Sequence, residues 1–390
     1  MLKQITFVFI AVLATAAAVP QAARASYETQ ARAAYIYDLT TDTVLFEKNA
    51  DAPLPPASMS KLMTLNMLFE ALRDGRVTLD TTFGVSTRAR KMGGSTMFLD
   101  ETDHPRVEDL IKGIIVQSGN DACVVVAEGL AGTEDEFARQ MNARAPEIGL
   151  TNSTFANASG WPDPNQLMSV HDLATLAKRL IVDFPEYYHY FSIEEYDFDG
   201  RSPANRYNRD PILGLGIGGD GLKTGHTDEA GYGLVGSAKQ GDRRIIFVFA
   251  GLDSMAARRQ EGEAMVNWGF RQFIEKKAAK EGDTLGQAPV WMGNHQSLKI
   301  VAPRDISLLV PATAKDSLET RIEYNSPIEA PVAKGDPVAE LVINARDMPE
   351  RRVPLVSDRD VTRGGFLPRL RASVTVLFDK AMSEVQSLME

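Results

Sequence analysis

Apolar residues along the first 280 positions are spaced as in a hairpin, a set of helices, a group of strands and a long last helix. The hairpin covers residues 33–38 and 43–47. Apolar spacings of three and four residues predict helices at 58–72, 107–116, 121–130, 134–145 and 170–182. Strands are predicted at 221–226, 232–239 and 244–250, followed by a helix at 256–277.

Residues with restricted backbone conformations set several of these boundaries. Pro55 and Pro56 end an extended segment before the first helix, and Gly75 provides its stop. Pro146 predicts an end or a kink in the helix that begins at 134. Ser169 precedes the helix at 170 as its cap.

The strands at the two ends of this region predict one antiparallel sheet, with the middle of the chain as a helical lobe. The predicted fold class is therefore α/β, in the α+β sense. This arrangement places Ser58, Ser118 and Lys223 where the sheet and the lobe meet, which is a usual location for a site.

The composition changes at Glu281-Gly282-Asp283. Beyond it, strand-like pieces separated by Pro, Gly and Asp predict a small all-β domain over 281–361. The pieces are 298–301, 306–310, 321–324, 338–343 and 353–356. Residues 362–390 then form an amphipathic segment, which fits a helix lying on a membrane or one packed on the β domain.

Residues 1–25 have the pattern of a signal peptide and are not expected to be part of the folded domain. Lys3 precedes a short apolar run, and Ala23-Arg24-Ala25 is an A-x-A cleavage site. The alternative, a transmembrane helix, is disfavoured because the run is short for a span. We therefore expect an exported protein.

Charge and composition exclude several classes of function. The net charge is −10 and becomes −12 without Lys3 and Arg24, so the chain is a poor candidate for binding nucleic acid. The single cysteine, Cys123, lies in an apolar run and predicts a buried thiol. The histidines have no metal-ligand spacing, and no Gly-rich nucleotide loop is present, so neither a metal nor a cofactor is expected.

Ser58 and Lys61 are the first candidates for chemistry. On a helix, residues three apart share a face, so the Lys61 amine can reach the Ser58 hydroxyl. A lysine with a pKa lowered by desolvation could take the serine proton. Taken alone, the pair also fits a helix-capping serine followed by a solvated lysine.

Two further triplets favour the catalytic interpretation of Ser58 and Lys61 over the capping one. Ser118-Gly119-Asn120 and Lys223-Thr224-Gly225 follow in order, each at a predicted element boundary. Ser-x-x-Lys, Ser-Asp-Asn and Lys-Thr-Gly mark penicillin-binding proteins and class A β-lactamases. The chain resembles the exported serine D-alanyl-D-alanine carboxypeptidases, the low-molecular-mass penicillin-binding proteins, over about residues 30–275.

This resemblance implies a β-lactamase/transpeptidase-like domain at 26–280 and a fully assigned site. Ser58 would be the nucleophile, Lys61 its base and Ser118 a proton relay. The residues expected to bind substrate are Asn120, Lys223, Thr224, Gly225, His226 and Arg258. Backbone N–H groups of Ser58 and His226 would form the oxyanion hole. For Arg258, the alternative is a solvated pair with Arg259.

The implied reaction is removal of the terminal D-Ala from peptidoglycan stem peptides in the periplasm, with peripheral contact to the inner membrane through the C-terminal segment. Gly119 replaces the aspartate of the general motif, which these carboxypeptidases accept. The Glu-x-x-Leu-Asn element of class A β-lactamases is absent, so penicillin is expected to inhibit covalently. The alternatives, in order, are a D,D-endopeptidase, a β-lactamase and a non-catalytic cell-wall scaffold.

Overall fold

Five antiparallel strands from the two ends of the first domain form one sheet, in the order β2-β1-β5-β4-β3. Their bounds are β1 Ala33–Asp38, β2 Thr43–Lys48, β3 Gly219–Thr227, β4 Gly231–Gln240 and β5 Arg243–Leu252. The computed structural model describes residues 27–312, 319–344 and 350–365. The proposed signal peptide and most of the C-terminal amphipathic segment lie outside these residues.

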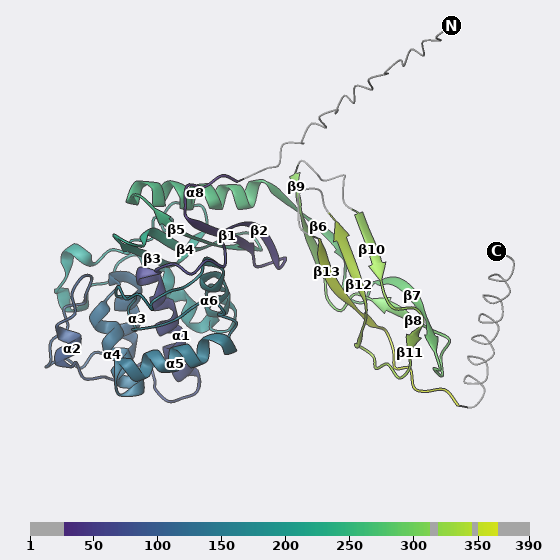
Figure 1. Cartoon of the computed structure of the whole chain (residues 1–390), viewed down its shortest axis with the longest axis horizontal. Helices are drawn as coiled ribbons and strands as arrows, with labels where there is room; N and C mark the ends of the chain where they lie inside the picture. The colour runs from purple at the N-terminus through teal and green to yellow at the C-terminus, as the bar shows by residue number, and fades with distance from the viewer. Residues whose placement is uncertain (1–26, 313–318, 345–349, 366–390) are drawn as a thin grey trace, which may run out of the picture.

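The central strand β5 is buried on both faces, which explains its nearly unbroken apolar sequence. Ile245, Phe247 and Phe249 belong to a core shared with α8 (Met255–Arg271), on one face of the sheet. Ile246 and Val248 belong to the core of the helical lobe, on the other face. Figure 1 shows the sheet between α8 and this lobe.

The helices of the lobe lie at the predicted positions, except for one short helix at Thr87–Arg90 that the sequence did not predict. They are the short turn η1 Ala57–Ser60, α1 Lys61–Arg73, α2 Thr87–Arg90, α3 Val107–Lys112, α4 Asn120–Ala131, α5 Glu134–Glu147 and α6 Val170–Val182. Ser169 caps α6, since its hydroxyl accepts a hydrogen bond from the Asp172 N–H at 3.0 Å. Pro146 lies in the last turn of α5, one residue before its end.

Residues 184–218 contain short helical turns and one isolated β-bridge, between Glu195 and Tyr207, in agreement with their weak periodicity. These turns are α7 Pro185–Tyr188, η3 His189–Ser192, η4 Phe198–Gly200 and η5 Pro203–Asn205. The segment continues through residues 208–212 to β3. It therefore brings non-periodic chain to the edge of the sheet, where the candidate site lies.

The prediction of one helix over 256–277 is wrong beyond Arg271. Gln272 ends α8, and Phe273–Ala279 forms strand β6, paired antiparallel with β9 (Ile306–Pro311). Phe273 fits both an apolar helix position and the buried end of a strand. Pairing with a strand distant in sequence decides between the two, and such pairing is not visible in local spacing.

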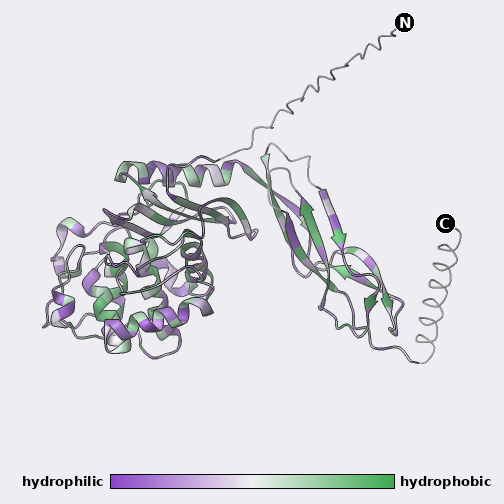
Figure 2. Ribbon diagram, in the orientation of Figure 1, coloured by the Kyte–Doolittle hydropathy of each residue, from purple (hydrophilic) through white to green (hydrophobic). Residues whose placement is uncertain are grey.

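The second domain is all β, and its five predicted strands are confirmed. Its further strands are β7 Thr284–Trp291, β8 Ser297–Val301, β10 Glu319–Glu323, β11 Ile328–Glu329, β12 Pro337–Asn344 and β13 Arg351–Ser357. The sequence missed β7 and β11: β7 contains Gly286 and Pro289, and β11 is two residues long. Figure 2 shows apolar residues in both domains, and the second has a core of its own.

Among the described residues, no helix combines the length and the apolar character needed to cross a membrane.

Candidate active site

Ser58 lies in η1 and Lys61 is the first residue of α1. The turn η1 packs against β3, the strand at one edge of the sheet. Ser58 is half-buried, whereas Lys61 is fully buried. The Lys61 Nζ donates to Ser58 Oγ at 2.9 Å, to Asn120 Oδ1 at 2.7 Å and to the Ser159 carbonyl at 2.6 Å. The N-cap residues of η1 and α1 are Pro56 and Ser60, so Ser58 caps neither helix. The alternative of a capping serine with a solvated lysine is therefore excluded.

The buried position of Lys61 changes its acid–base behaviour. Burial, together with the nearby Arg209 guanidinium, lowers the pKa of Lys61 to about 8 against the opposing effect of Cys123. Cys123 is a buried free thiol, as predicted, and burial raises its pKa to about 12. A large fraction of Lys61 is therefore neutral near pH 8.

The second triplet reaches the site through an unusual turn between α3 and α4. The last turn of α3 widens into a π-helical turn, η2, over Gly113–Gln117. Ser118 follows in the left-handed conformation, with φ 58° and ψ 37°, and is almost fully buried. Residues other than glycine seldom adopt the left-handed conformation. Where they do, they are often part of a functional site. The turn carries Asn120 to the start of α4, where it contacts Lys61.

Crowding explains the glycine between Ser118 and Asn120. A Cβ atom at Gly119 would lie 3.0 Å from Asp121 Oδ1 and 3.1 Å from Met97 Cγ. An aspartate at this position would have to displace one of these groups. The departure from the general Ser-Asp-Asn motif is therefore consistent with local packing.

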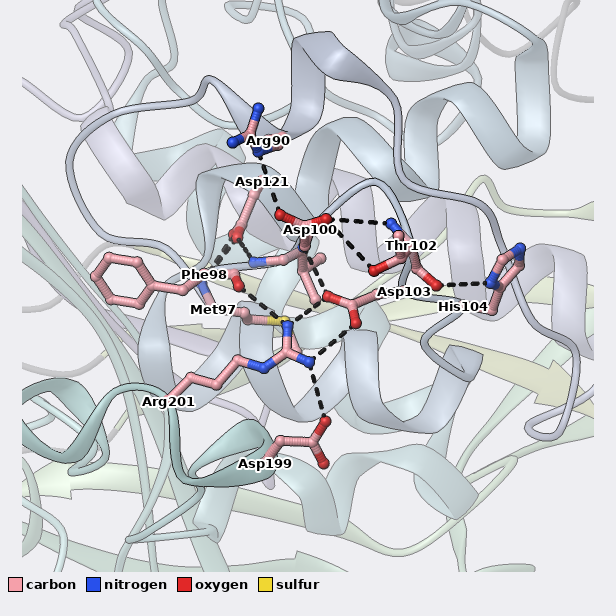
Figure 3. Close-up of polar contacts among 11 residues, drawn as sticks. Arg90, Met97, Phe98, Asp100, Thr102, Asp103, His104, Asp121, Asp199 and Arg201 are labelled. Atoms are coloured by element: carbon pink, nitrogen blue, oxygen red, sulfur yellow. Dashed lines mark hydrogen bonds and ion pairs between the residues drawn. The ribbon is translucent and has the colours of Figure 1, made fainter.

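The loop over residues 93–104 is hydrogen-bonded to Asn120 and Asp121, at and next to the second triplet. Asn120 Nδ2 donates to the Gly93 carbonyl at 2.8 Å. The Asp121 carboxylate accepts from the N–H groups of Met97 at 3.0 Å and Leu99 at 3.1 Å. Figure 3 shows Arg201 closing the same loop, with its guanidinium between Asp103 and Asp199. These hydrogen bonds and ion pairs hold the loop in place beside Asn120.

The third triplet lies on β3, the terminal strand of the sheet order, which packs against η1. A Cβ atom at Gly225 would lie 2.8 Å from the Pro56 carbonyl oxygen and 3.3 Å from the Met59 amide nitrogen. Glycine therefore permits the close approach of β3 to the turn that carries Ser58. Thr224 is buried, and the exposed His226 ring lies against Tyr232, with centroids 3.9 Å apart.

Several cations surround the same region. Lys223 is 3% exposed and donates to the Thr224 carbonyl at 3.2 Å. Burial lowers the pKa of Lys223 well below its usual value, and Arg209 and Lys61 lower it further. Arg258 is 5% exposed, with its guanidinium 5.5 Å from the centre of the Tyr232 ring, whereas Arg259 is exposed. Arg258 is therefore not half of a solvated pair.

Arg209 and Asp210 are absent from the site predicted from sequence. Arg209 donates to the Gln117 carbonyl at 3.1 Å and to Ser95 Oγ at 2.9 Å, which joins it to the second triplet. Asp210 is buried, and this burial raises its pKa to about 7 against the opposing effect of Arg258 and Lys223. No periodicity or motif marks these residues, because they lie in irregular chain before β3.

The loop that holds Ser159 is also missing from the predicted site, although its composition predicted a loop. Asn157 Oδ1 accepts from the N–H groups of Ser159 at 3.1 Å, Gly160 at 2.8 Å and Trp161 at 3.0 Å. These three hydrogen bonds hold the backbone of the loop, and with it the Ser159 carbonyl that accepts from Lys61. Gly160 has φ +75°, and a Cβ atom there would lie 1.9 Å from the Ala57 carbonyl oxygen.

Family models match both parts of the chain. The model described as D-alanyl-D-alanine carboxypeptidase matches residues 17–254. The chain belongs to the D-alanyl-D-alanine carboxypeptidase family. The model described as the C-terminal domain of penicillin-binding protein 5 matches residues 273–363.

Relatives and solved structures agree with this family. The chain is 36% identical over 357 residues to D-alanyl-D-alanine carboxypeptidase DacC of Escherichia coli (strain K12), covering 89% of this chain and 88% of that protein. Its fold matches penicillin-binding protein 5 from Haemophilus influenzae with a TM-score of 0.79 and 30% identity, covering 87% and 99% of the two chains.

A shorter structure matches a smaller share of the chain. Penicillin-binding protein D2 from Listeria monocytogenes, in its ampicillin-bound form, matches with a TM-score of 0.57 and 29% identity, covering 63% of this chain and 99% of that one. The predicted fold class and family are therefore confirmed.

Proposed function

We propose that the chain is a serine D-alanyl-D-alanine carboxypeptidase that removes the terminal D-Ala from peptidoglycan pentapeptide stems through an acyl-enzyme on Ser58. The observation that carries this proposal is the 2.9 Å contact between Ser58 Oγ and the fully buried Lys61 amine. A serine hydroxyl needs such a base to become a nucleophile. Family membership supports the choice of the D-Ala–D-Ala bond as substrate.

The contacts of Lys61 favour its action as the base. A neutral amine keeps two N–H groups and one lone pair, and Asn120 Oδ1 and the Ser159 carbonyl are both acceptors. When these acceptors hold the two N–H groups, the lone pair faces Ser58 Oγ. Lys61 then takes the serine proton as Oγ attacks the carbonyl carbon of the penultimate D-Ala.

The first step breaks the peptide bond between the two D-Ala residues and forms an ester on Ser58. The proton taken by Lys61 is returned to the departing amine, with Ser118 as the relay. The N–H groups of Ser58 and His226 stabilise the oxyanion, and losing one such donor typically costs roughly 3 kcal/mol of transition-state stabilisation. Water then hydrolyses the ester and regenerates the serine.

The cations around β3 suit the free carboxylate at the end of the substrate. Lys223, Thr224 and Arg258 bind this group, and Gly225 lets β3 lie close enough to Ser58 for the scissile bond to reach it. Charged hydrogen bonds to a carboxylate in a partly buried site are strong and directional. A substrate without this carboxylate should therefore bind weakly.

Penicillins acylate the same serine and inhibit the enzyme, since the ring-opened ester is hydrolysed slowly. The ampicillin-bound relative supports binding of β-lactams by this domain. We further propose that the chain is exported to the periplasm by its first 25 residues and contacts the outer face of the inner membrane through its C-terminal segment. Export is tested by cell fractionation of chains with and without residues 1–25.

The activity is tested by measuring D-Ala release from a synthetic stem pentapeptide by mass spectrometry. Wild type should release one D-Ala, and Ser58→Ala should abolish release. Lys61→Arg keeps the charge but raises the basicity, so release should fall by at least a hundredfold. Absence of release by wild type from every stem peptide tested would contradict the proposal.

A further inference from the structure

Asp210 is a buried acidic residue that the proposed mechanism does not use. It is 5% exposed, and its N–H donates to Asn208 Oδ1 at 3.0 Å. Oδ1 of its carboxyl group accepts from the Ile212 N–H at 3.0 Å. Oδ2 is shielded from solvent and has no hydrogen-bond partner among the described residues. A buried carboxylate oxygen without a partner is costly, so the groups around Oδ2 decide the charge of Asp210.

The packing of Ile212 shows which elements enclose this carboxyl group. A Cβ atom added at Gly219, the first residue of β3, would lie 2.8 Å from Ile212 Cδ1. A Cβ atom added at Gly262, in α8, would lie 3.2 Å from Ile212 Cγ2. The segment that carries Asp210 therefore packs between the start of β3 and α8.

Two of the proposed carboxylate-binding cations lie on the same two elements. Lys223 follows Gly219 by four residues along β3, and Arg258 precedes Gly262 by about one turn of α8. Both are almost fully buried, and Arg258 Nε has no hydrogen-bond partner in the described part of the chain. Both act electrostatically on Asp210. Because Asp210 Oδ2 and Arg258 Nε each lack a partner, these groups interact through space and not through a hydrogen bond.

The other charged groups around Asp210 are paired. Asp220, which acts on Asp210 from β3, accepts from Arg244 Nη2 at 2.7 Å. Arg209, the neighbour of Asp210 in sequence, donates to the Gln117 carbonyl at 3.1 Å. Of these groups, Asp210 therefore remains to compensate the two buried cations of the proposed carboxylate site.

We propose that Asp210 sets the affinity of this enzyme for the terminal carboxylate of its substrate, by competing with that carboxylate for Lys223 and Arg258. The inference rests on the proposed function and deepens it. The charged form of Asp210 offsets part of the positive charge that attracts the substrate, whereas the protonated form leaves that charge to the substrate. Protonation and substrate binding therefore favour each other, as linkage requires. A ligand with a neutral terminal group gains nothing from this proton.

Two substrates that differ only in their terminal group test this proposal: Nα,Nε-diacetyl-L-Lys-D-Ala-D-Ala and the same peptide ending in a carboxamide. Both react through Ser58 and Lys61, so the ionisation of Lys61 cancels in the ratio of their kcat/KM values. Burial raises the pKa of Asp210 to about 7, so its carboxyl group is mostly protonated at pH 6 and mostly ionised at pH 8. The ratio in favour of the carboxylate should fall about fivefold between these pH values.

Asp210→Asn keeps the size of the side chain and removes its charge. At pH 8 this variant should raise the ratio about fivefold, mostly through KM, and its ratio should change less than twofold between pH 6 and pH 8. Asp210→Ser also removes the charge and gives the same test if Asp210→Asn does not fold. Asp253→Asn, at an exposed position, is the matched control and should behave as wild type.

Lys223→Arg separates the effect of Asp210 from that of Lys223, whose own pKa is lowered by burial. A guanidinium stays charged at both pH values, so the fall of the ratio should persist in this variant. A fall that persists in Asp210→Asn and disappears in Lys223→Arg would overturn the proposal. A wild-type ratio that is the same at pH 6 and pH 8 would also overturn it.

If wild type releases neither D-Ala nor its amide, the proposed function fails instead. Benzylpenicillin and its methyl ester then test the inference, since they differ in the same kind of carboxylate. The ratio of their rate constants for acylation of Ser58 should show the same fall between pH 6 and pH 8, and Asp210→Asn should remove it. A ratio that Asp210→Asn leaves unchanged would overturn the role of Asp210 without bearing on the substrate.

Discussion

In the proposed mechanism Lys61 acts as the base, because its surroundings make the charged form of the amine unfavourable. Burial is the largest cause, and Arg209 adds to it. The sequence predicted the Ser58–Lys61 pair and the apolar run that buries it. It could not predict Arg209, the Ser159 carbonyl or Asp210, because these residues reach the site through tertiary contacts of irregular segments. The motifs thus identify the groups proposed to react, but not the neighbouring groups that shift their pKa or hold them in position.

The lowered pKa of Lys61 predicts how acylation depends on pH. Protonated Lys61 cannot accept the Ser58 proton, so the rate constant for penicillin acylation should rise about tenfold per pH unit and level off above about pH 8. Stopped-flow measurement with a fluorescent penicillin gives this profile. A rate that is flat between pH 6 and pH 9 would contradict the assignment of Lys61 as the base.

Asp210 predicts a dependence of stability on pH. Its folded pKa of about 7 exceeds the ordinary value of 3.8, so the folded state holds the proton more tightly than the unfolded state. This stabilisation is present below about pH 4 and is lost as pH rises through 7.

Asp210→Asn should therefore stabilise the fold by on the order of 3 kcal/mol at pH 8 relative to its effect at pH 4. Urea denaturation at the two pH values measures this difference. Asp253→Asn, at an exposed position, is the control and should show no such difference. A similar effect of Asp210→Asn at both pH values would show that the buried carboxyl is not the cause.

At the scale of elements, periodic sequence predicted most helices and strands, whereas the connections that shape the site were not predictable. The π-helical turn at Gly113–Gln117 and the left-handed Ser118 have no signature in apolar spacing. The loop after Gly93 is held by Asp121, and the loop after Asn157 by its own side chain. These hydrogen bonds depend on partners that meet only in the folded chain.

Gly160 tests whether this close packing matters for catalysis. Gly160→Ala places a methyl group against the Ala57 carbonyl in a backbone conformation that disfavours a side chain. We expect a loss of about 1–3 kcal/mol of stability and at least a tenfold slower acylation, because the turn bearing Ser58 must shift.

Thermal unfolding and penicillin acylation measure these two effects. Gly84→Ala is the matched control, since nothing lies within 4 Å of a Cβ atom there. Equal behaviour of the two variants would show that the approach of Gly160 to η1 has no role in the site.

At the scale of the molecule, the two domains have separate cores. The cores of the first domain draw on residues 31–266, and that of the second on residues 279–361. Arg351 connects the domains, since it donates to Thr43 Oγ1 of the first domain at 3.2 Å and to the Ser307 carbonyl of its own domain at 3.2 Å. The sequence predicted this division, although it extended the last helix of the first domain into β6.

A chain of residues 27–272 should therefore fold and react without the second domain. The ampicillin-bound Listeria structure covers 63% of this chain while 99% of its own chain is matched, so a shorter chain of this fold exists, which supports the expectation. We expect its penicillin acylation rate to be within about twofold of the full chain, in the same stopped-flow assay. A loss of more than tenfold in a folded fragment would show that the β domain contributes to the site.

The most direct test of the central claim is peptide mapping of the full chain after incubation with penicillin. The account predicts a single penicilloyl adduct on the peptide that contains Ser58, formed by wild type and absent from Ser58→Ala. An adduct on any other residue, or no adduct at all on a folded wild-type protein, would contradict it.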